Sequence, residues 1–189
     1  MSASFRFLDE RQVHQGHVWR VVVADFAAPD GSTFERDIVR SPGAVAAVPL
    51  VFDAEGNASV VLIRQWRPTY ARDVIEIPAG MRDVDGEPTE ETARRELIEE
   101  VGMVPATLEL LIELLPSPGV LDSITTIYLA TGCETAERSL HGPEEEFSEV
   151  LHIPLDEAVA MVERGEITDA KSVAGLLLTE RRVRAGDHG

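Results

Sequence analysis

The chain has 189 residues, of which 44% are apolar and 27% charged, a composition typical of a globular protein that buries a core of its own. A formal net charge of −17 argues against a broad nucleic-acid-binding surface, because such a surface must attract phosphate groups. No apolar run reaches the ~18 residues that a membrane span requires, so neither nucleic acid nor a membrane is an expected partner.

Two features of the whole chain predict a cytoplasmic location. The N-terminus turns polar within a few residues and lacks the apolar core of a secretory signal. Cys133 is the single cysteine of the sequence, which rules out an intrachain disulfide and agrees with a reducing compartment.

The N-terminal residues 1–41 predict a small antiparallel β segment. Turn and strand residues alternate there, with strands expected at residues 5–11, 17–26 and 32–40. We expect the main domain at residues 42–184 and a disordered tail at residues 185–189.

The main domain is predicted to be a mixed sheet between helical layers, an α/β (α+β) fold. Two apolar runs separated by a polar cluster, at residues 44–52 and 59–66, indicate a hairpin buried on both faces. Strands interrupted by helices favour the layered arrangement. Further strands are expected near residues 108–115, 124–130 and 150–155, and helices near residues 90–101, 156–164 and 171–181.

The helix predicted at residues 90–101 carries the most informative pattern. Thr89 is its expected N-cap and Gly102 its expected stop. Ala93, Leu97 and Val101 are expected to share its buried face. Glu96, Glu99 and Glu100 have spacings of three and four, so their carboxylates lie close to one side of the helix.

Clustered carboxylates repel one another, and a hard divalent cation that takes oxygen ligands makes such a cluster favourable. Magnesium fits, because it accepts a few carboxylates and shares its remaining positions with water and substrate phosphates. Arg95 is expected to turn away from this face and to pair with Glu99 or with Glu87; we favour Glu87. A solvated acidic helix face is the alternative interpretation, and the surrounding residues argue against it.

These residues together resemble the Nudix box. The chain differs from the family pattern by one extra residue in the loop between Gly80 and Glu87, which costs little in closure entropy and leaves the helix unaltered. The fixed positions of the box are filled by Gly80, Glu87, Arg95, Glu96, Leu97, Glu99, Glu100 and Gly102, with Met103 in the last place.

The resemblance implies a loop–helix–loop within a Nudix-type α/β/α sandwich and a magnesium-dependent hydrolase, with Mn²⁺ as an alternative ion. Glu96 and Glu100 would be the principal metal ligands, Glu99 an additional one, and the Ala79 carbonyl would complete the shell. Glu99 and Glu100 would thereby take part in catalysis, whereas Gly80, Glu87, Arg95 and Gly102 would be structural.

Features outside the box resemble the ADP-ribose pyrophosphatase and nucleoside-diphosphate-sugar hydrolase group. They are Gln65-Trp66-Arg67, the run from Glu76 to Gly80, and Ser117-Pro118-Gly119. The resemblance implies cleavage of a small nucleotide substrate to a nucleoside monophosphate and a sugar phosphate. It also implies a homodimer built with the N-terminal strands.

Four residues before the box are candidates for substrate binding. Arg64 and Arg67 are expected to contact the diphosphate from the strand face opposite the Trp66 indole, or to be ordinary edge charges. Trp66 stacks on a base in one interpretation and packs in the core or dimer interface in the other. Glu76 is expected to orient Arg67 or the loop.

A general base in this group is often a glutamate on a loop after the box. Among Glu144, Glu145 and Glu146 we rank Glu145 first; a solvated acidic loop is the alternative. Two other functions remain open, hydrolysis of oxidised (deoxy)nucleoside triphosphates and a catalytically silent Nudix-fold ligand sensor. Ser123 stands where several ADP-ribose hydrolases carry a glutamate, which leaves the substrate open.

Overall fold

The computed structural model describes residues 4–139 and 146–186. The chain divides into two compact units, one formed by Met1–Gly43 with Leu115–Ile124 and the other by Ala44–Leu114 with Thr125–Gly189. The first unit thus includes a loop from the middle of the chain, which the division predicted from the sequence did not contain.

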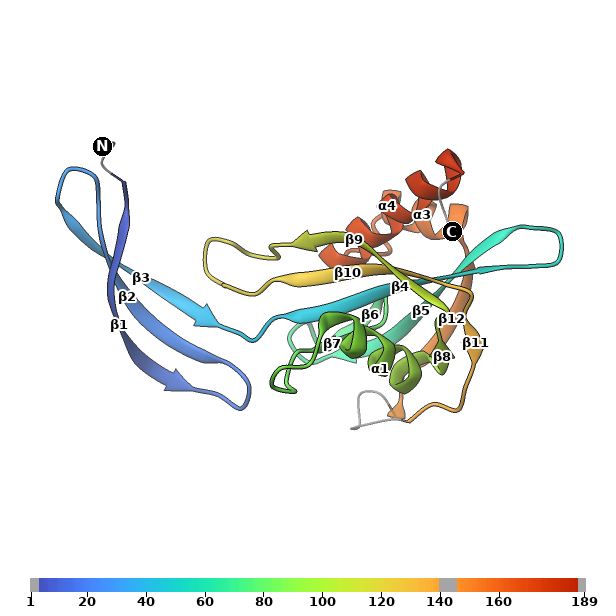
Figure 1. Cartoon of the computed structure of the whole chain (residues 1–189), viewed down its shortest axis with the longest axis horizontal. Coiled ribbons are helices and arrows are strands. Elements are labelled where there is room, and N and C mark those ends of the chain that lie inside the picture. The colour runs from blue at the N-terminus through green and yellow to red at the C-terminus, as the bar shows by residue number, and fades with distance from the viewer. Residues whose placement is uncertain (1–3, 140–145, 187–189) are drawn as a thin grey trace. The chain divides into compact units, whose positions relative to one another are not determined.

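The first unit is a three-stranded antiparallel sheet in the order β1-β2-β3, with β1 at Arg6–Gln15, β2 at Arg20–Ala27 and β3 at Thr33–Arg40 (Figure 1). The rings of Phe26 and Phe34 stack at 5.5 Å between centroids. The loop of residues 115–124 joins β3 because Val39 bridges Leu121 and Arg40 pairs with Asp122 at 3.0 Å.

The second unit contains the predicted mixed sheet. Strand β10 pairs with β4 in parallel, whereas the other pairings are antiparallel. The predicted hairpin is confirmed, since β4 pairs with β5 from Leu50↔Val60 to Phe52↔Ala58. The main path runs β12-β5-β4-β10-β9, with β6 beside β5 and β7 beside β4. The strands are β4 Ala44–Phe52, β5 Ala58–Arg67, β6 Arg72–Glu76, β7 Ala79–Met81, β9 Thr107–Leu114, β10 Thr125–Thr131 and β12 Glu149–Pro154, beside a small pair of β8 Met103–Val104 and β11 Glu134–Thr135.

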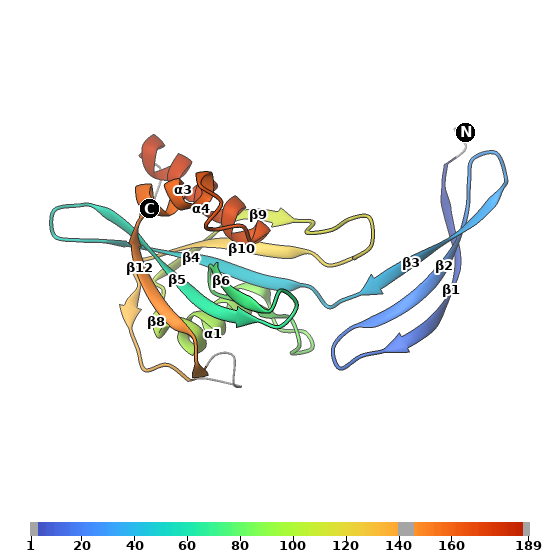
Figure 2. The ribbon, with the colours of Figure 1, turned by 180° about the vertical axis from the view of Figure 1, so that it is seen from behind.

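Helices cover both faces of this sheet, as the sequence predicts (Figure 2). On one face lies α1 (Thr89–Val101), whose Ala93, Leu97 and Val101 are buried against β4, β5 and β10. The other face is covered by α3 (Leu155–Glu163) and α4 (Ala170–Ala185), which share a second apolar cluster with the same strands. The α/β/α architecture therefore packs α1 directly against the sheet.

Two details differ from expectation. Thr89 is the first residue of α1 rather than its N-cap, which is Pro88, and the Thr89 hydroxyl lies 2.7 Å from the Tyr128 hydroxyl. Helix α4 continues to Ala185, and residues 187–189 of the predicted tail lie outside the described residues. No helix in the described ranges is long and apolar enough to cross a membrane.

Candidate functional site

The carboxylates of Glu96 and Glu100 face strand β7. Both residues are buried, at 9% and 5% exposure, although they are charged. Burial of this kind is costly unless each carboxylate has partners, so their contacts define the site.

Glu100 is fixed by the backbone of β7. Its Oε2 accepts a hydrogen bond from the Ala79 N–H at 2.7 Å. Ala79 in turn pairs with Ala46 of β4, so the sheet positions the donor. The expected role of the Ala79 carbonyl as a metal ligand stays a prediction.

Glu96 occupies space that Gly80 leaves open. A Cβ added at residue 80 would lie 2.0 Å from Oε1 of Glu96, far inside van der Waals contact. Gly80 has no positive φ, so its backbone does not itself require glycine. The glycine at the start of the box is therefore explained by the carboxylate beside it.

Arg95 contacts several acids of the box. Its Nη1 donates to Glu96 at 2.7 Å and to Glu99 at 3.2 Å, and its Nη2 lies 3.3 Å from Glu87. The expectation that Arg95 turns away from the carboxylate face is wrong, because a guanidinium has five donors and reaches both sides of its helix position.

The contacts between Arg95 and these acids also shift the pKa values of Arg95 and Glu87. Burial works to lower the pKa of Arg95, but pairing with Glu87 and the fields of Glu96 and Glu99 more than offset it and raise the pKa. The Arg95 and Thr92 hydrogen bonds lower the pKa of Glu87. In residues 4–139 and 146–186 no group of three or more histidine, cysteine, aspartate or glutamate side chains is already arranged to hold a metal ion.

A second charged cluster lies at the end of β5 and β6. Arg67 donates to the Glu76 carboxylate through Nε at 2.6 Å and Nη2 at 2.8 Å. Lys171 of α4 also contacts Glu76, whose side chain is 4% exposed. Burial pushes the pKa of Glu76 upward, yet the two cations lower it overall. The hydrogen bond to Glu76 raises the pKa of Arg67, and the field of Glu100 adds to this effect.

The predicted placement of Arg64 is wrong. Residues two apart on a strand share a face, so Arg64 lies on the side of Trp66, and Arg67 lies on the other. Arg64 is exposed and pairs with Glu149 of β12 at 2.6 Å. Trp66 is 49% exposed.

The structure describes only one of the three candidate base residues. Glu144 and Glu145 fall outside the described residues, and Glu146 is exposed. Lys171, Asp169 and Ser172 were not among the site residues predicted from the sequence. Lys171 had one signal, since it is the only lysine among 17 basic residues.

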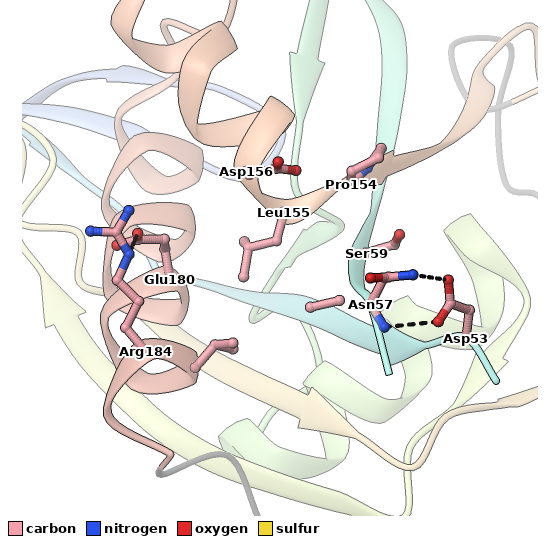
Figure 3. Close-up of a pocket in the computed structure, with 10 residues that line it drawn as sticks. Asp53, Asn57, Ser59, Pro154, Leu155, Asp156, Glu180 and Arg184 are labelled. Atoms are coloured by element: carbon pink, nitrogen blue, oxygen red, sulfur yellow. Dashed lines mark hydrogen bonds and ion pairs between the residues drawn. The ribbon is translucent and has the colours of Figure 1, made fainter. Parts of the chain in front are cut away.

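A cavity of about 530 Å³ lies elsewhere, between the β4–β5 hairpin and helices α3 and α4 (Figure 3). Its polar groups largely pair with one another: Asn57 donates to Asp53 at 2.8 Å, and Arg184 pairs with Glu180. None of the predicted site residues lines it.

Sequence comparisons with known proteins support the identification of the Nudix box. Residues 41–176 match the NUDIX domain model. An ADP-ribose pyrophosphatase of Mycobacterium tuberculosis is 35% identical over 92% of this chain and 82% of its own length. A GDP-mannose pyrophosphatase of Cronobacter sakazakii is 34% identical over 97% of this chain and 98% of its own length.

The fold agrees as well. The crystal structure of an ADP compounds hydrolase matches with a TM-score of 0.81 and 24% identity, over 98% of this chain and 97% of that one. The chain therefore belongs to the NUDIX family, as a pyrophosphohydrolase of nucleoside diphosphate derivatives.

Proposed function

We propose that the protein hydrolyses the pyrophosphate bond of ADP-ribose or a nucleotide sugar, with magnesium, to a nucleoside monophosphate and a sugar phosphate. The observation that carries this proposal is the pair of buried carboxylates, Glu96 and Glu100, held against β7 by Gly80 and Ala79. The relatives named for ADP-ribose and GDP-mannose support this substrate class.

Nudix hydrolases generally use a divalent metal, and we assign magnesium here, with manganese as the alternative. Glu96, Glu99 and Glu100 offer the oxygen donors that such ions prefer, and Gly80 supplies the room that the Glu96 carboxylate needs. The bound ion would polarise the phosphate oxygens and lower the pKa of water. To bind the ion, Glu96 and Glu99 would give up their hydrogen bonds from Arg95 in exchange for contacts with the metal.

The chain's own residues supply orientation and charge. We assign Arg67 to the diphosphate. Glu76 accepts from Nε and Nη2 of Arg67, which leaves Nη1 to donate to an anion. In the reaction, the oxygen of water forms a bond to one phosphorus and the bridging oxygen leaves on the other phosphate. Glu145 is our candidate for accepting the proton from water.

We further propose that the protein acts as a cytoplasmic homodimer. The first unit supports the dimer, because Phe7, Val13 and Trp19 are each at least half exposed in or beside its sheet. The lone Cys133 supports a reducing compartment. Sedimentation velocity should give the mass of two chains, and a monomer at micromolar concentration would reject the dimer.

Product analysis tests the reaction. The protein is incubated with magnesium and a panel of ADP-ribose, nucleotide sugars, dinucleoside polyphosphates and oxidised deoxynucleoside triphosphates, and the products are identified by mass spectrometry. Two monophosphate esters from ADP-ribose or a nucleotide sugar are expected. Release of inorganic pyrophosphate from the triphosphates alone would move the protein to the oxidised-nucleotide class, and no turnover would favour a sensor.

A further inference from the structure

Lys171 lies in the first turn of α4 and reaches the buried Glu76. Its side chain is only 15% exposed, and its Nζ contacts Glu76 Oε2 and lies 3.0 Å from Asp169. Glu76 is 95 residues away in the sequence, so this contact joins α4 to the end of β6. A lysine ammonium is seldom buried to this extent unless charged partners replace its hydrating water.

The start of α4 also holds the backbone that follows Glu76. Ser172 Oγ accepts a hydrogen bond from the Ile77 N–H at 2.8 Å and donates to Asp169 at 2.6 Å. Two residues further on, the Ala79 N–H donates to Glu100. The segment from Glu76 to Ala79 therefore links α4 to the glutamates of α1.

Glu76 divides its charge between two cations. Its Oε2 accepts from both Arg67 Nη2 and Lys171, whereas Oε1 accepts from Arg67 Nε. With Lys171 removed, the buried carboxylate would keep its ion pair with Arg67, and the cluster would lose one positive charge. An anionic diphosphate would then meet a weaker attraction at Arg67.

We propose that Lys171 is a positioning residue, which holds Glu76 so that Arg67 is oriented for the substrate diphosphate. The inference rests on the proposed function, because it takes Arg67 as the diphosphate contact. It adds a residue of α4, on the sheet face opposite α1, to the set that determines substrate affinity.

The test is a double-mutant cycle in the full-length protein with ADP-ribose and magnesium. Lys171→Met should raise KM roughly tenfold and change kcat less than about threefold, the size of effect that loss of one charge-assisted contact produces. Lys171→Arg should restore most of the affinity. In an Arg67→Met background, Lys171→Met should change KM less than about twofold, because the group it positions is gone.

Two controls separate this role from simple stabilisation. Arg182→Met removes a different cation of α4, which pairs with Glu109, and should leave KM unchanged. Calorimetry with an α,β-methylene analogue of ADP-ribose should show the same roughly tenfold weakening in Lys171→Met without any turnover. If Lys171→Met does not fold, Lys171→Gln takes its place in the cycle.

The outcomes distinguish the two proposals. A wild-type KM in Lys171→Met, or an equal KM penalty in the Arg67→Met background, would overturn the role of Lys171. A wild-type protein that neither binds the analogue nor hydrolyses any member of the substrate panel would instead overturn the proposed function.

Discussion

Replacement of Gly80 by alanine should damage catalysis while leaving the fold nearly intact. The added Cβ would lie 2.0 Å from Glu96 Oε1, so the carboxylate must move by more than about 1 Å to regain van der Waals contact. The backbone accepts alanine, since Gly80 is not in the left-handed region. The clash falls on the end of a flexible side chain, so we expect a stability loss of only about 1 kcal/mol.

Catalysis should respond far more strongly, because a displacement of about 1 Å in a catalytic group can cost about 100-fold in rate. We therefore expect kcat/KM for ADP-ribose to fall about 100-fold and the magnesium concentration for half-maximal rate to rise. The assay is steady-state release of AMP across a magnesium titration, beside urea unfolding of the same protein.

Gly86→Ala, in the loop that follows β7, is the matched control. Gly86 has a φ of 75°, and an added Cβ there meets no atom within 4 Å. Alanine should cost about 1 kcal/mol of stability through backbone strain, with kcat/KM unchanged. Wild-type activity and magnesium dependence in Gly80→Ala, or a loss of activity in both variants in proportion to their loss of stability, would show that Gly80 does not make room for the Glu96 carboxylate.

Three further predictions follow from single contacts. Glu100→Gln should lower kcat by two orders of magnitude or more, about 3 kcal/mol, while circular dichroism stays unchanged; near-normal turnover would remove Glu100 from the metal site. Cys133, whose pKa burial raises to about 11 from 9.0, should be alkylated at pH 8 roughly 100-fold more slowly than a free thiol, and an equal rate would contradict that burial. Glu76→Gln should cost about 3 kcal/mol at pH 7, because it leaves Arg67 without its anion and Lys171 with Asp169 alone. The Glu76 pKa is lowered from 4.5, so this deficit should shrink in urea unfolding as pH falls below about 4.5, and a deficit constant down to pH 3 would argue against the ion pairs.

The sequence predicts best those features that depend on neighbours along the chain. The spacing of Glu96 and Glu100 places both on one side of a helix, whatever surrounds that helix. The apolar runs of β4 and β5 predict a buried hairpin. The family pattern supplies the rest of the box, including the glycine whose reason appears only when the Glu96 carboxylate is seen beside it.

Contacts between distant segments could not be predicted in this way. Arg40 and Asp122 are 82 residues apart, and their pairing brings a middle loop into the first unit. Lys171 and Glu76 are 95 residues apart, and neither residue alone carries a pattern that indicates the other. The error at Arg64 has a different origin, since the two-residue period of a strand already places it beside Trp66.

We propose that Glu96 and Glu100 form a divalent-metal centre for pyrophosphate hydrolysis. Its most direct test is mass spectrometry of ADP-ribose incubated in H₂¹⁸O with wild-type protein and with Glu100→Gln, each with magnesium and with EDTA. We expect AMP and ribose 5-phosphate, one of them carrying a single ¹⁸O, only from the wild-type protein with magnesium. Equal product formation by Glu100→Gln, or by wild-type protein in EDTA, would rule out this metal centre.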